Sequence, residues 1–265
     1  MLKHLKSISS RIQVVHLQRS ICKVARVNKS VLIIKNMGHE GPGLLEEMLV
    51  ENDILSTIID LNAGDAFPTA AGFDAMIVMG GEDSANDETP KMKTEILRIR
   101  DAIDQKIPYF GVCLGLQTLV KAAGGIVKKN EVREVAFRDQ EGNYFSVETM
   151  DEGKQDPIMK GLPENVAMFH LHGETVGLTP AMTLLASGKW CRNQIVRVAP
   201  RMYGMQGHLE LTDTMFHDWC QKNDWLRECD QEALKRDWNE QKAQLGQSIR
   251  TFFGNFLRIA NLILE

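Results

Sequence analysis

Cys113 stands between two glycines in the segment FGVCLG (residues 110–115), a position that suits a nucleophile. The run Tyr109–Val112 before it predicts a strand, and the apolar spacing after it predicts a helix that ends at Gly124 and Gly125. Flanking glycines permit the tight strand-to-helix turn on which some hydrolases carry their nucleophile. A thiol there faces the positive end of the helix dipole, which favours the thiolate. The pattern G-x-C-x-G is weak by itself, because a free cysteine is more often a small buried apolar side chain.

A nucleophilic thiol needs a base, and His208 is the histidine whose surroundings suit that role. The segment RMYGMQGHLELT (201–212) puts Glu210 two residues beyond His208. On an extended chain, residues two apart point to the same face, so the carboxylate can hold the imidazole in one tautomer. Cys113, His208 and Glu210 then form a predicted catalytic triad, in which the thiol attacks, the imidazole transfers the proton and the carboxylate orients the imidazole.

Attack on a carbonyl also requires hydrogen-bond donors for the oxyanion. The residue after an elbow nucleophile contributes its backbone N–H, so Leu114 is one predicted donor. A second donor is expected from VMGGEDS (78–84), where Gly80 and Gly81 follow a predicted strand and allow the backbone to approach a substrate closely. Without the triad, the same two glycines would predict only an ordinary turn.

The elements that must position these residues are predicted to alternate between strand and helix. Short runs rich in β-branched or aromatic residues predict buried strands, and apolar residues at helical spacing lie between them. The predicted strands are 31–34, 58–60, 75–79 and 109–112, and the predicted helices include 44–49 and 92–103. This alternation predicts an α/β fold of three layers, with a mostly parallel, flavodoxin-like sheet and helices on both faces. Ligands of such sheets bind outside the carboxyl ends of the strands, where Cys113 falls.

From about residue 126 to residue 200 the predicted elements are shorter and β-like, as in GNYFSVETM and QIVRVA. They suggest an antiparallel extension or edge strands on the same sheet. The end of the chain is helical, because apolar residues recur at spacings of three and four from Ile249 to Ile263. This stripe predicts packing against the core, with a partner interface as the alternative.

Composition predicts one large domain. The chain has 265 residues, of which 43% are hydrophobic, and a net charge of −4. Residues 1–39 hold eight Lys or Arg and no acid. The rest of the chain therefore has 23 basic and 35 acidic residues, a net charge near −12. Such a surface disfavours a nucleic-acid role. We expect residues 1–29 to be a basic extension, either a flexible tail or a targeting segment, and residues 30–265 to form a single domain.

Cysteine usage bears on the compartment. Five cysteines, at 22, 113, 191, 220 and 229, are scattered without a CxxC pair. This argues against a disulfide scaffold and for a reducing compartment. No stretch reaches the roughly 18 to 20 apolar residues of a membrane helix. We therefore expect a cytoplasmic protein without a cofactor, with mitochondrial targeting by the basic start as the alternative.

Six segments, in this order, resemble the class I (triad) glutamine amidotransferases, in particular the stand-alone proteins similar to the amidotransferase domain of GMP synthase. They are MGGEDSANDE, GVCLGLQ, EVREVAF, HLHGETVGLTP, LLASG and YGMQGHLE, and the resemblance runs from about Val31 to the C-terminus. Any one segment is a modest signal, but all six in order are strongly specific. The resemblance implies the class I glutamine amidotransferase fold and hydrolysis of the side-chain amide of glutamine.

The resemblance also implies roles for single residues. Cys113 would attack the carboxamide of glutamine, ammonia would leave with a proton from His208, and water would hydrolyse the glutamyl thioester. Gly81 and Leu114 would form the oxyanion hole. The residues expected to bind substrate are Gln117, Glu82, and Leu171 and Gly173 of the LHGE segment.

Several positions depart from the family pattern. The usual FHPE reads GHLE here, through Gly207 and Leu209, and Leu116 stands where the elbow motif often has histidine. Glu82 replaces the proline that usually follows the second glycine, and a carboxylate there could repel a substrate carboxylate or engage a substrate amine. Two alternatives therefore stay open: a γ-glutamyl peptidase or hydrolase acting on conjugates, and a non-catalytic regulatory protein on the same scaffold.

Metals and partners follow from what else the sequence offers. His170 and His172 share a face of a predicted strand, but no third ligand with suitable spacing is recognisable, so no metal site is expected. No phosphate loop or second large domain is recognisable either. We expect a small-molecule substrate, glutamine or a γ-glutamyl compound, and a separate synthetase subunit as the ammonia acceptor. No nucleic-acid or membrane partner is expected.

Overall fold

The computed structural model of the protein describes residues 29–264. The basic extension predicted for residues 1–29 therefore lies, except for Lys29, outside the described residues. Within residues 29–264, no helix is long and apolar enough to cross a membrane.

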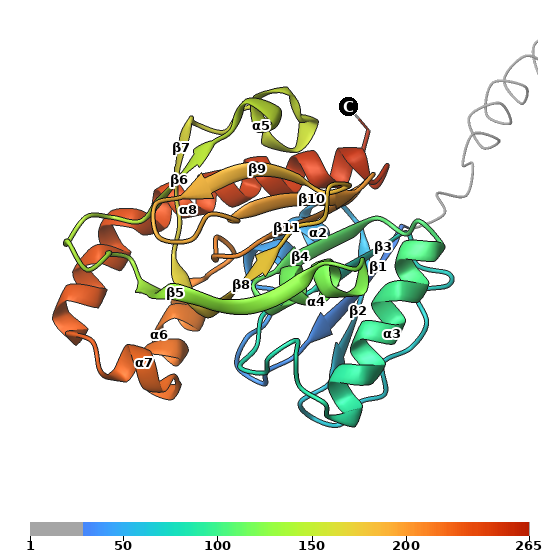
Figure 1. Cartoon of the computed structure of the whole chain (residues 1–265), viewed down its shortest axis with the longest axis horizontal. Helices are drawn as coiled ribbons and strands as arrows, with labels where there is room; N and C mark the ends of the chain where they lie inside the picture. Colours follow the sequence, from blue (N-terminus) through green and yellow to red (C-terminus); the bar gives the residue numbers. More distant parts are fainter. Residues whose placement is uncertain (1–28, 265) are drawn as a thin grey trace, which may run out of the picture.

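A nine-stranded mixed sheet forms the centre of the fold (Figure 1). Its strands lie in the order β2-β1-β3-β4-β11-β10-β9-β6-β7. The first five strands are parallel to one another, and the last four extend the sheet by antiparallel pairing. The strands are β1 (Ser30–Lys35), β2 (Leu55–Asp60), β3 (Ala75–Val78), β4 (Tyr109–Val112), β6 (Ser146–Thr149), β7 (Asn165–Ala167), β9 (Thr183–Gly188), β10 (Ile195–Ala199) and β11 (Met202–Met205).

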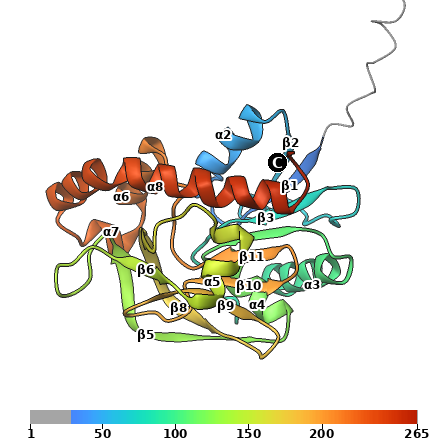
Figure 2. The same ribbon diagram turned by 90° about the horizontal axis from the view of Figure 1, so that it is seen from above.

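Helices cover both faces of this sheet. Figure 2 shows α2 and α8 on one face and α3 and α4 on the other. Each face has its own core, and neighbouring residues of β1 point into different ones, Ile33 toward α2 and α8 and Leu32 toward α3 and α4. The predicted three-layer α/β fold is confirmed. The helices are α2 (Leu44–Glu51), α3 (Pro90–Asp104), α4 (Leu114–Ala122), α5 (Asp151–Gln155), the 3-10 helix η1 (Pro157–Met159), α6 (Asp213–Lys222), α7 (Asp224–Arg227) and α8 (Gln231–Ile259).

The predicted strands form, but one differs in burial. The four central residues of β1 and all of β3 and β4 are buried. The prediction that residues 58–60 are a buried strand is wrong, because β2 is the outer strand of the parallel half and leaves Leu55 and Ile58 exposed. A short apolar run predicts a strand well, but its place in the sheet depends on pairings that such a run does not encode.

Residues 126 to 200 were expected to extend the main sheet, and only some of their strands do so. The strands β6, β7, β9 and β10 do so, but β5 (Ile126–Ala136) and β8 (His170–Gly177) form a separate two-stranded antiparallel sheet. The prediction of a single sheet is wrong for these two strands. Their register shifts between Lys129 and Glu134, and this ribbon carries one edge of the pocket described below.

The C-terminal apolar stripe packs against the core, as predicted. Phe252, Phe253 and Phe256 of α8 are fully buried. Their rings surround the ring of Phe110 on β4, with centroid separations of 5.5, 5.3 and 5.2 Å. Aromatic clusters of this kind stabilise beyond their buried area. Because β4 runs directly into Cys113, α8 supports the strand that positions the cysteine.

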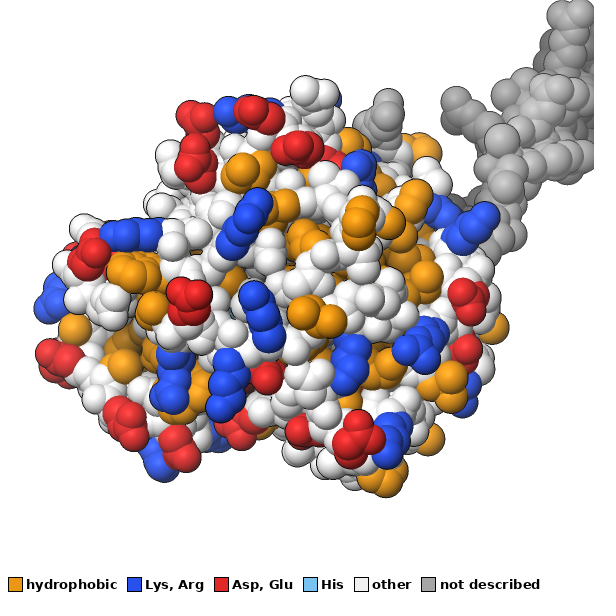
Figure 3. Space-filling view, viewed as in Figure 1, with side chains coloured by type: hydrophobic (Ala, Val, Ile, Leu, Met, Phe, Trp, Pro, Cys, Tyr) orange, Lys and Arg blue, Asp and Glu red, His pale blue; other side chains and the backbone are white. Residues whose placement is uncertain are grey.

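The face of the molecule drawn in Figure 3 has a mixed charge. Lys and Arg side chains are interspersed there with Asp and Glu side chains. Proteins that track a nucleic acid along one face usually gather basic side chains into a patch or stripe. This face therefore gives no support to a nucleic-acid role.

We predict that Phe252→Ala lowers the free energy of unfolding by about 3–5 kcal/mol, because it empties a fully buried aromatic site. Urea denaturation followed by circular dichroism measures the change. The matched control is Gln244→Ala on the exposed side of the same helix, which we expect to change stability by less than about 0.5 kcal/mol. Equal effects of the two substitutions would contradict the packing described for α8.

Candidate active site

Cys113 lies on a strained turn between β4 and α4. Its backbone has φ 51° and ψ −105°, a left-handed conformation that is unusual for a residue with a side chain. The turn is fixed by hydrogen bonds: the Cys113 N–H donates to the Met205 carbonyl at 2.8 Å, and the Cys113 carbonyl accepts from the N–H of Leu116 at 3.0 Å. The cysteine itself thus adopts the sharp bend that the sequence predicted.

The two glycines that flank Cys113 serve close packing. A Cβ on Gly111 would stand 2.5 Å from the carbonyl carbon of Gly115, and a Cβ on Gly115 would stand 2.1 Å from the Val78 carbonyl oxygen. Neither separation is tolerable for carbon, so strand β4, helix α4 and strand β3 approach closely only because these positions lack side chains. The sequence predicted that these glycines permit the turn. In the structure they permit the close packing of the elements on either side of it.

His208 is held on several sides. The backbone N–H of His208 donates to the Phe169 carbonyl at 2.7 Å. The ring centroids of His208 and Trp219 lie 4.9 Å apart in an edge-to-face arrangement. Its Nδ1 lies 2.8 Å from Oε1 of Glu210, and Oε2 of Glu210 accepts from the Leu209 N–H at 3.0 Å. Both side chains are buried. The carboxylate therefore fixes the orientation of the imidazole.

The structure brings Cys113, His208 and Glu210 together. The interaction with the Cys113 side chain is among those that raise the pKa of His208. A Cβ placed on Gly80 would stand 3.2 Å from Cε1 of His208 and 3.5 Å from Cβ of Cys113, so both side chains border the same small space. Burial disfavours the charged ring, but the charge and hydrogen bond of Glu210 and the neighbouring Cys113 side chain outweigh it and raise the pKa of His208 well above its usual range. A thiol and an imidazole so arranged can exchange a proton.

The two predicted oxyanion donors are also neighbours. A Cβ on Gly81 would stand 3.3 Å from Cδ2 of Leu114 and 2.7 Å from Cβ of Asn36, so residue 81 must be glycine here. The Leu114 N–H is the first of α4, and the first N–H groups of a helix have no acceptor within the helix. These backbone groups are available to bind an oxyanion beside Cys113.

A pocket of about 380 Å³ opens in front of Cys113. All four residues predicted to bind substrate line it: Glu82, Gln117, Leu171 and Gly173. Gln117 is buried, and its Nε2 donates to the Glu174 carbonyl at 3.3 Å and to Oε1 of Gln206 at 3.4 Å. Glu82 is exposed at the rim. The size suits a small-molecule ligand.

The sequence did not point to three parts of this site. Glu40, in the segment after β1, lines the pocket, and so does Trp225 of α7. Nε2 of Gln206 donates to Sγ of Cys113 at 3.7 Å. A signal existed for Gln206, because it lies two residues before His208 and so shares its face on an extended chain. Glu40 precedes a glycine and a proline, which predicts only a turn. Nothing in the sequence indicated that α7 would reach the pocket.

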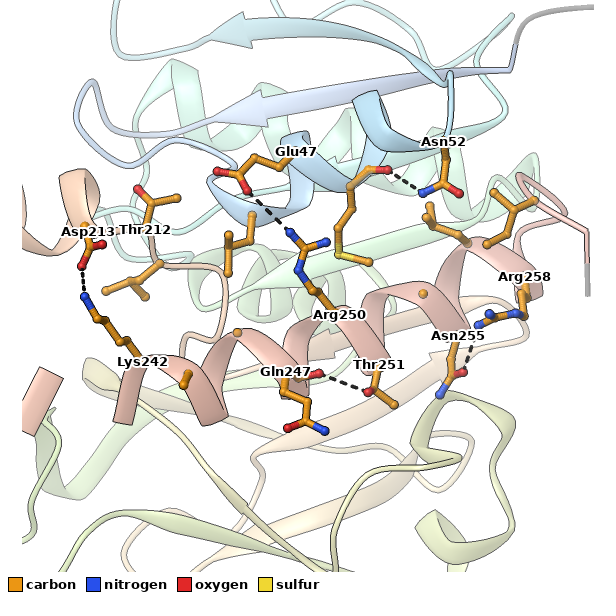
Figure 4. A pocket seen from close by; sticks show the side chains of 18 of the residues that line it. Glu47, Asn52, Thr212, Asp213, Lys242, Gln247, Arg250, Thr251, Asn255 and Arg258 are labelled. Carbon is orange, nitrogen blue, oxygen red and sulfur yellow. Dashed lines mark hydrogen bonds and ion pairs between the residues drawn. The ribbon is translucent and has the colours of Figure 1, made fainter. Parts of the chain in front are cut away.

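A larger hollow, of about 1040 Å³, lies elsewhere (Figure 4). It runs between α2 and α8, where Arg250 faces Glu47 and Lys242 faces Asp213. None of the triad residues lines it. The smaller pocket is lined by Cys113, and we therefore take it as the candidate active site.

The histidine pair on β8 has a third neighbour that the sequence did not reveal. Ligand-type atoms of Glu134, His170 and His172 lie within 4.8 Å of one another, and all three side chains are buried. Oε2 of Glu134 lies 2.8 Å from Nε2 of His172 and also accepts from Nε2 of Gln194 at 2.8 Å. Nε2 of His172 also lies 3.3 Å from Nδ1 of His170, so hydrogen bonds connect the three side chains and Gln194.

Glu95 and Asn36 support the wall on which Gly81 rests. Asn36 Nδ2 donates to Oε1 of Glu95 at 3.2 Å and to the Met79 carbonyl at 3.3 Å. Glu95 is fully buried, and burial raises its pKa to about 7. Within the described part of the chain, Oδ1 of Asn36 and Oε2 of Glu95 have no hydrogen-bond partner. Gly81 therefore lies against a buried polar pair with two acceptor atoms that lack partners among the described residues.

Comparison with known proteins agrees with this geometry. The family model described as glutamine amidotransferase class-I matches residues 34–225. Two similar curated proteins are the glutamine amidotransferase-like protein YfeJ of Salmonella typhimurium, 29% identical over 57% of this chain, and the GMP synthase [glutamine-hydrolyzing] of Borreliella burgdorferi, 24% identical over 77% of it. The chain spans 62% of the length of YfeJ and 37% of that of the GMP synthase.

A solved structure has the same fold. The glutamine amido transferase from Methylobacillus flagellatus superimposes with a TM-score of 0.77 at 25% identity, over 88% of this chain and 95% of that one. An elbow cysteine at the carboxyl edge of a parallel sheet is a feature of α/β hydrolytic enzymes. The chain belongs, within that class, to the class I glutamine amidotransferase family. The predicted family is confirmed.

We predict that Glu95→Gln stabilises the protein at alkaline pH. The raised pKa means that folding favours protonated Glu95, so its contribution to stability is complete below its unfolded pKa and is lost as the pH rises toward about 7. The amide removes this loss and can donate to Asn36 Oδ1. The gain should be about 1–3 kcal/mol near pH 8 and should shrink toward pH 5, by urea denaturation.

The matched control is Glu88→Gln, an exposed carboxylate just before the same helix. It should show no such gain at alkaline pH. A difference between Glu95→Gln and wild type that stays the same at both pH values would show that Glu95 does not titrate as described.

Proposed function

We propose that the protein hydrolyses the side-chain amide of glutamine through a thioester on Cys113. In the first step the sulfur bonds to the carboxamide carbon, the carbon–nitrogen bond breaks, and His208 gives its proton to the departing ammonia. In the second step His208 takes a proton from water, which attacks the thioester and releases glutamate. Glu210 orients the imidazole and stabilises its charged form. The N–H groups of Gly81 and Leu114 stabilise the oxyanion in both steps.

One observation carries the proposal: the 2.8 Å contact between His208 Nδ1 and Glu210 Oε1. The Cys113 side chain borders the same space beside Gly80 as this ring does. An imidazole held in one orientation next to a thiol can take the thiol proton and so produce the reactive thiolate. Membership of the class I family supports glutamine as the substrate.

A γ-glutamyl compound is the second candidate substrate, and the acidic lining of the pocket is the reason to retain this candidate. Glu40, Glu82, Asp83, Glu174 and Asp224 line the pocket, and no Lys or Arg among residues 29–264 does. Glutamine and γ-glutamyl compounds share an α-amino group and an α-carboxylate, so this wall favours a γ-glutamyl compound only where its leaving group carries a further amino group. The chemistry at Cys113 is the same for both substrates, so only the leaving group differs.

We also propose that a separate synthetase receives the ammonia. The chain spans 37% of the GMP synthase that it resembles, so most of that protein has no counterpart in it. Free hydrolysis is the alternative fate. Addition of a candidate synthetase should raise glutamine turnover only if the two proteins are coupled.

We predict that Cys113→Ala abolishes glutamate release from glutamine, because no other group can form the thioester. A coupled glutamate assay with glutamine and a panel of γ-glutamyl dipeptides measures activity and specificity together. The matched control is Cys220→Ala, since burial raises the pKa of this half-buried thiol to about 11 and it lies away from the pocket. We expect that control to retain wild-type turnover.

Residual glutamate release by Cys113→Ala equal to that of wild type would exclude the proposed mechanism. Turnover of a γ-glutamyl dipeptide that exceeds turnover of glutamine in the wild type would favour the second candidate.

A further inference from the structure

Glu40 is a buried carboxyl group next to the catalytic cysteine. Its side chain is 5% exposed, and it lines the pocket together with Cys113 and Gly81. A Cβ placed on Gly80 would stand 2.7 Å from Oε2 of Glu40, as well as close to His208 and Cys113. Glu40, His208 and Cys113 therefore border one small space beside Gly80.

The carboxyl group lacks the partners that usually accompany a buried acid. Oε2 has no hydrogen-bond partner among the described residues. The charged groups that face it are His208, Glu210 and Glu82; the first favours its charge and the other two oppose it. No Lys or Arg is among them. Burial, with these two acids, raises its pKa to about 7. An unpaired buried carboxyl group destabilises a fold, so its presence beside reactive groups indicates use by a ligand.

The backbone holds Glu40 firmly in this place. The carbonyl of the preceding residue, His39, accepts from the indole N–H of Trp219 at 3.3 Å, and the N–H of Glu40 donates to the Met37 carbonyl at 3.3 Å. Trp219 is the same side chain that packs against the ring of His208. Glu40 and His208 are therefore positioned by one shared anchor rather than independently.

The proposed reaction requires a hydrogen-bond acceptor at this point. The oxyanion must face Gly81 and Leu114, and the departing nitrogen must face His208, which protonates it. A primary carboxamide carries two N–H donors on that nitrogen. Inside a pocket, donors without an acceptor cost about 1–3 kcal/mol each. Glu40 lies on the His208 side, where these donors must point.

We propose that the Glu40 carboxyl group accepts a hydrogen bond from the carboxamide nitrogen of the substrate and so turns the leaving group toward His208. This role rests on the proposed function and adds a determinant of selectivity to it: a preference for substrates whose leaving atom carries N–H. Glu40 neither gains nor loses a proton in the step. The carbon–sulfur bond forms, the carbon–nitrogen bond breaks, and the proton on the nitrogen comes from His208.

The test compares glutamine with glutamate γ-methyl ester, whose leaving oxygen carries no hydrogen. Wild type, Glu40→Gln and Glu40→Leu are assayed in the full chain for glutamate release from both compounds. We expect kcat/KM for glutamine to fall about 10- to 100-fold, more in Glu40→Leu, which has no acceptor, than in Glu40→Gln, which keeps one. Turnover of the ester should stay within about threefold of wild type.

Folding and site integrity are checked in the same samples. Labelling of Cys113 by iodoacetamide at the wild-type rate shows an intact site, and Glu47→Gln, an exposed carboxylate in α2, is the matched control. The ratio of glutamine to ester turnover should also rise with pH through about 7 in wild type and stay flat in Glu40→Gln. Rates for the two compounds share the contributions of Cys113 and Glu210, so these cancel in the ratio.

Two results overturn the proposal. If both compounds lose activity equally in the Glu40 variants, Glu40 acts on the thiol or the fold and not on the leaving nitrogen. If neither compound loses activity, Glu40 has no role in turnover. A wild-type protein that turns over neither compound overturns the proposed function as well, and is thereby distinguished from failure of the Glu40 role alone.

Discussion

The contact between the His208 imidazole and the Glu210 carboxylate is the interaction on which the rest of the site depends. Both groups are buried, and a charged imidazole in such a place is sustained only by a partner of opposite charge. The surrounding elements hold this partner. The N–H of Leu44, at the start of α2, donates to the Glu210 carbonyl at 2.9 Å, and Gly43 passes so close to that carbonyl that no side chain would fit.

The elbow at Cys113 supplies the other half of the arrangement at a conformational cost. A left-handed residue that carries a side chain is tolerated only where its surroundings determine it fully. Here the determinants are the Met205 carbonyl on the neighbouring strand, the close contact of Gly115 with β3, and the aromatic cluster of α8 beneath Phe110. The core therefore acts on the chemistry by keeping β4 and its last residue in place.

Local patterns predicted most of this structure. The grouping of Cys113, His208 and Glu210 followed from residue types and a two-residue spacing, and the layers followed from the alternation of strands and helices. The exposure of β2 and the separate β5–β8 sheet did not, because they depend on which strands pair over long distances. The sequence did not predict the places of Glu40, Glu134 and Trp225 for the same reason. Each lies far in sequence from the groups that it contacts. A motif identifies reactive atoms, but the folded chain determines what surrounds them.

The most direct test of the central claim is the rate at which iodoacetamide labels each cysteine at neutral pH, followed by peptide mapping. Burial raises the pKa of Cys191 and of Cys220 to about 11, so these thiols should react slowly. The account predicts that Cys113 is labelled at least about tenfold faster than Cys191, Cys220 and Cys229, and that Glu210→Gln removes most of this advantage. Labelling of Cys113 no faster than the others, or unchanged by Glu210→Gln, would contradict it.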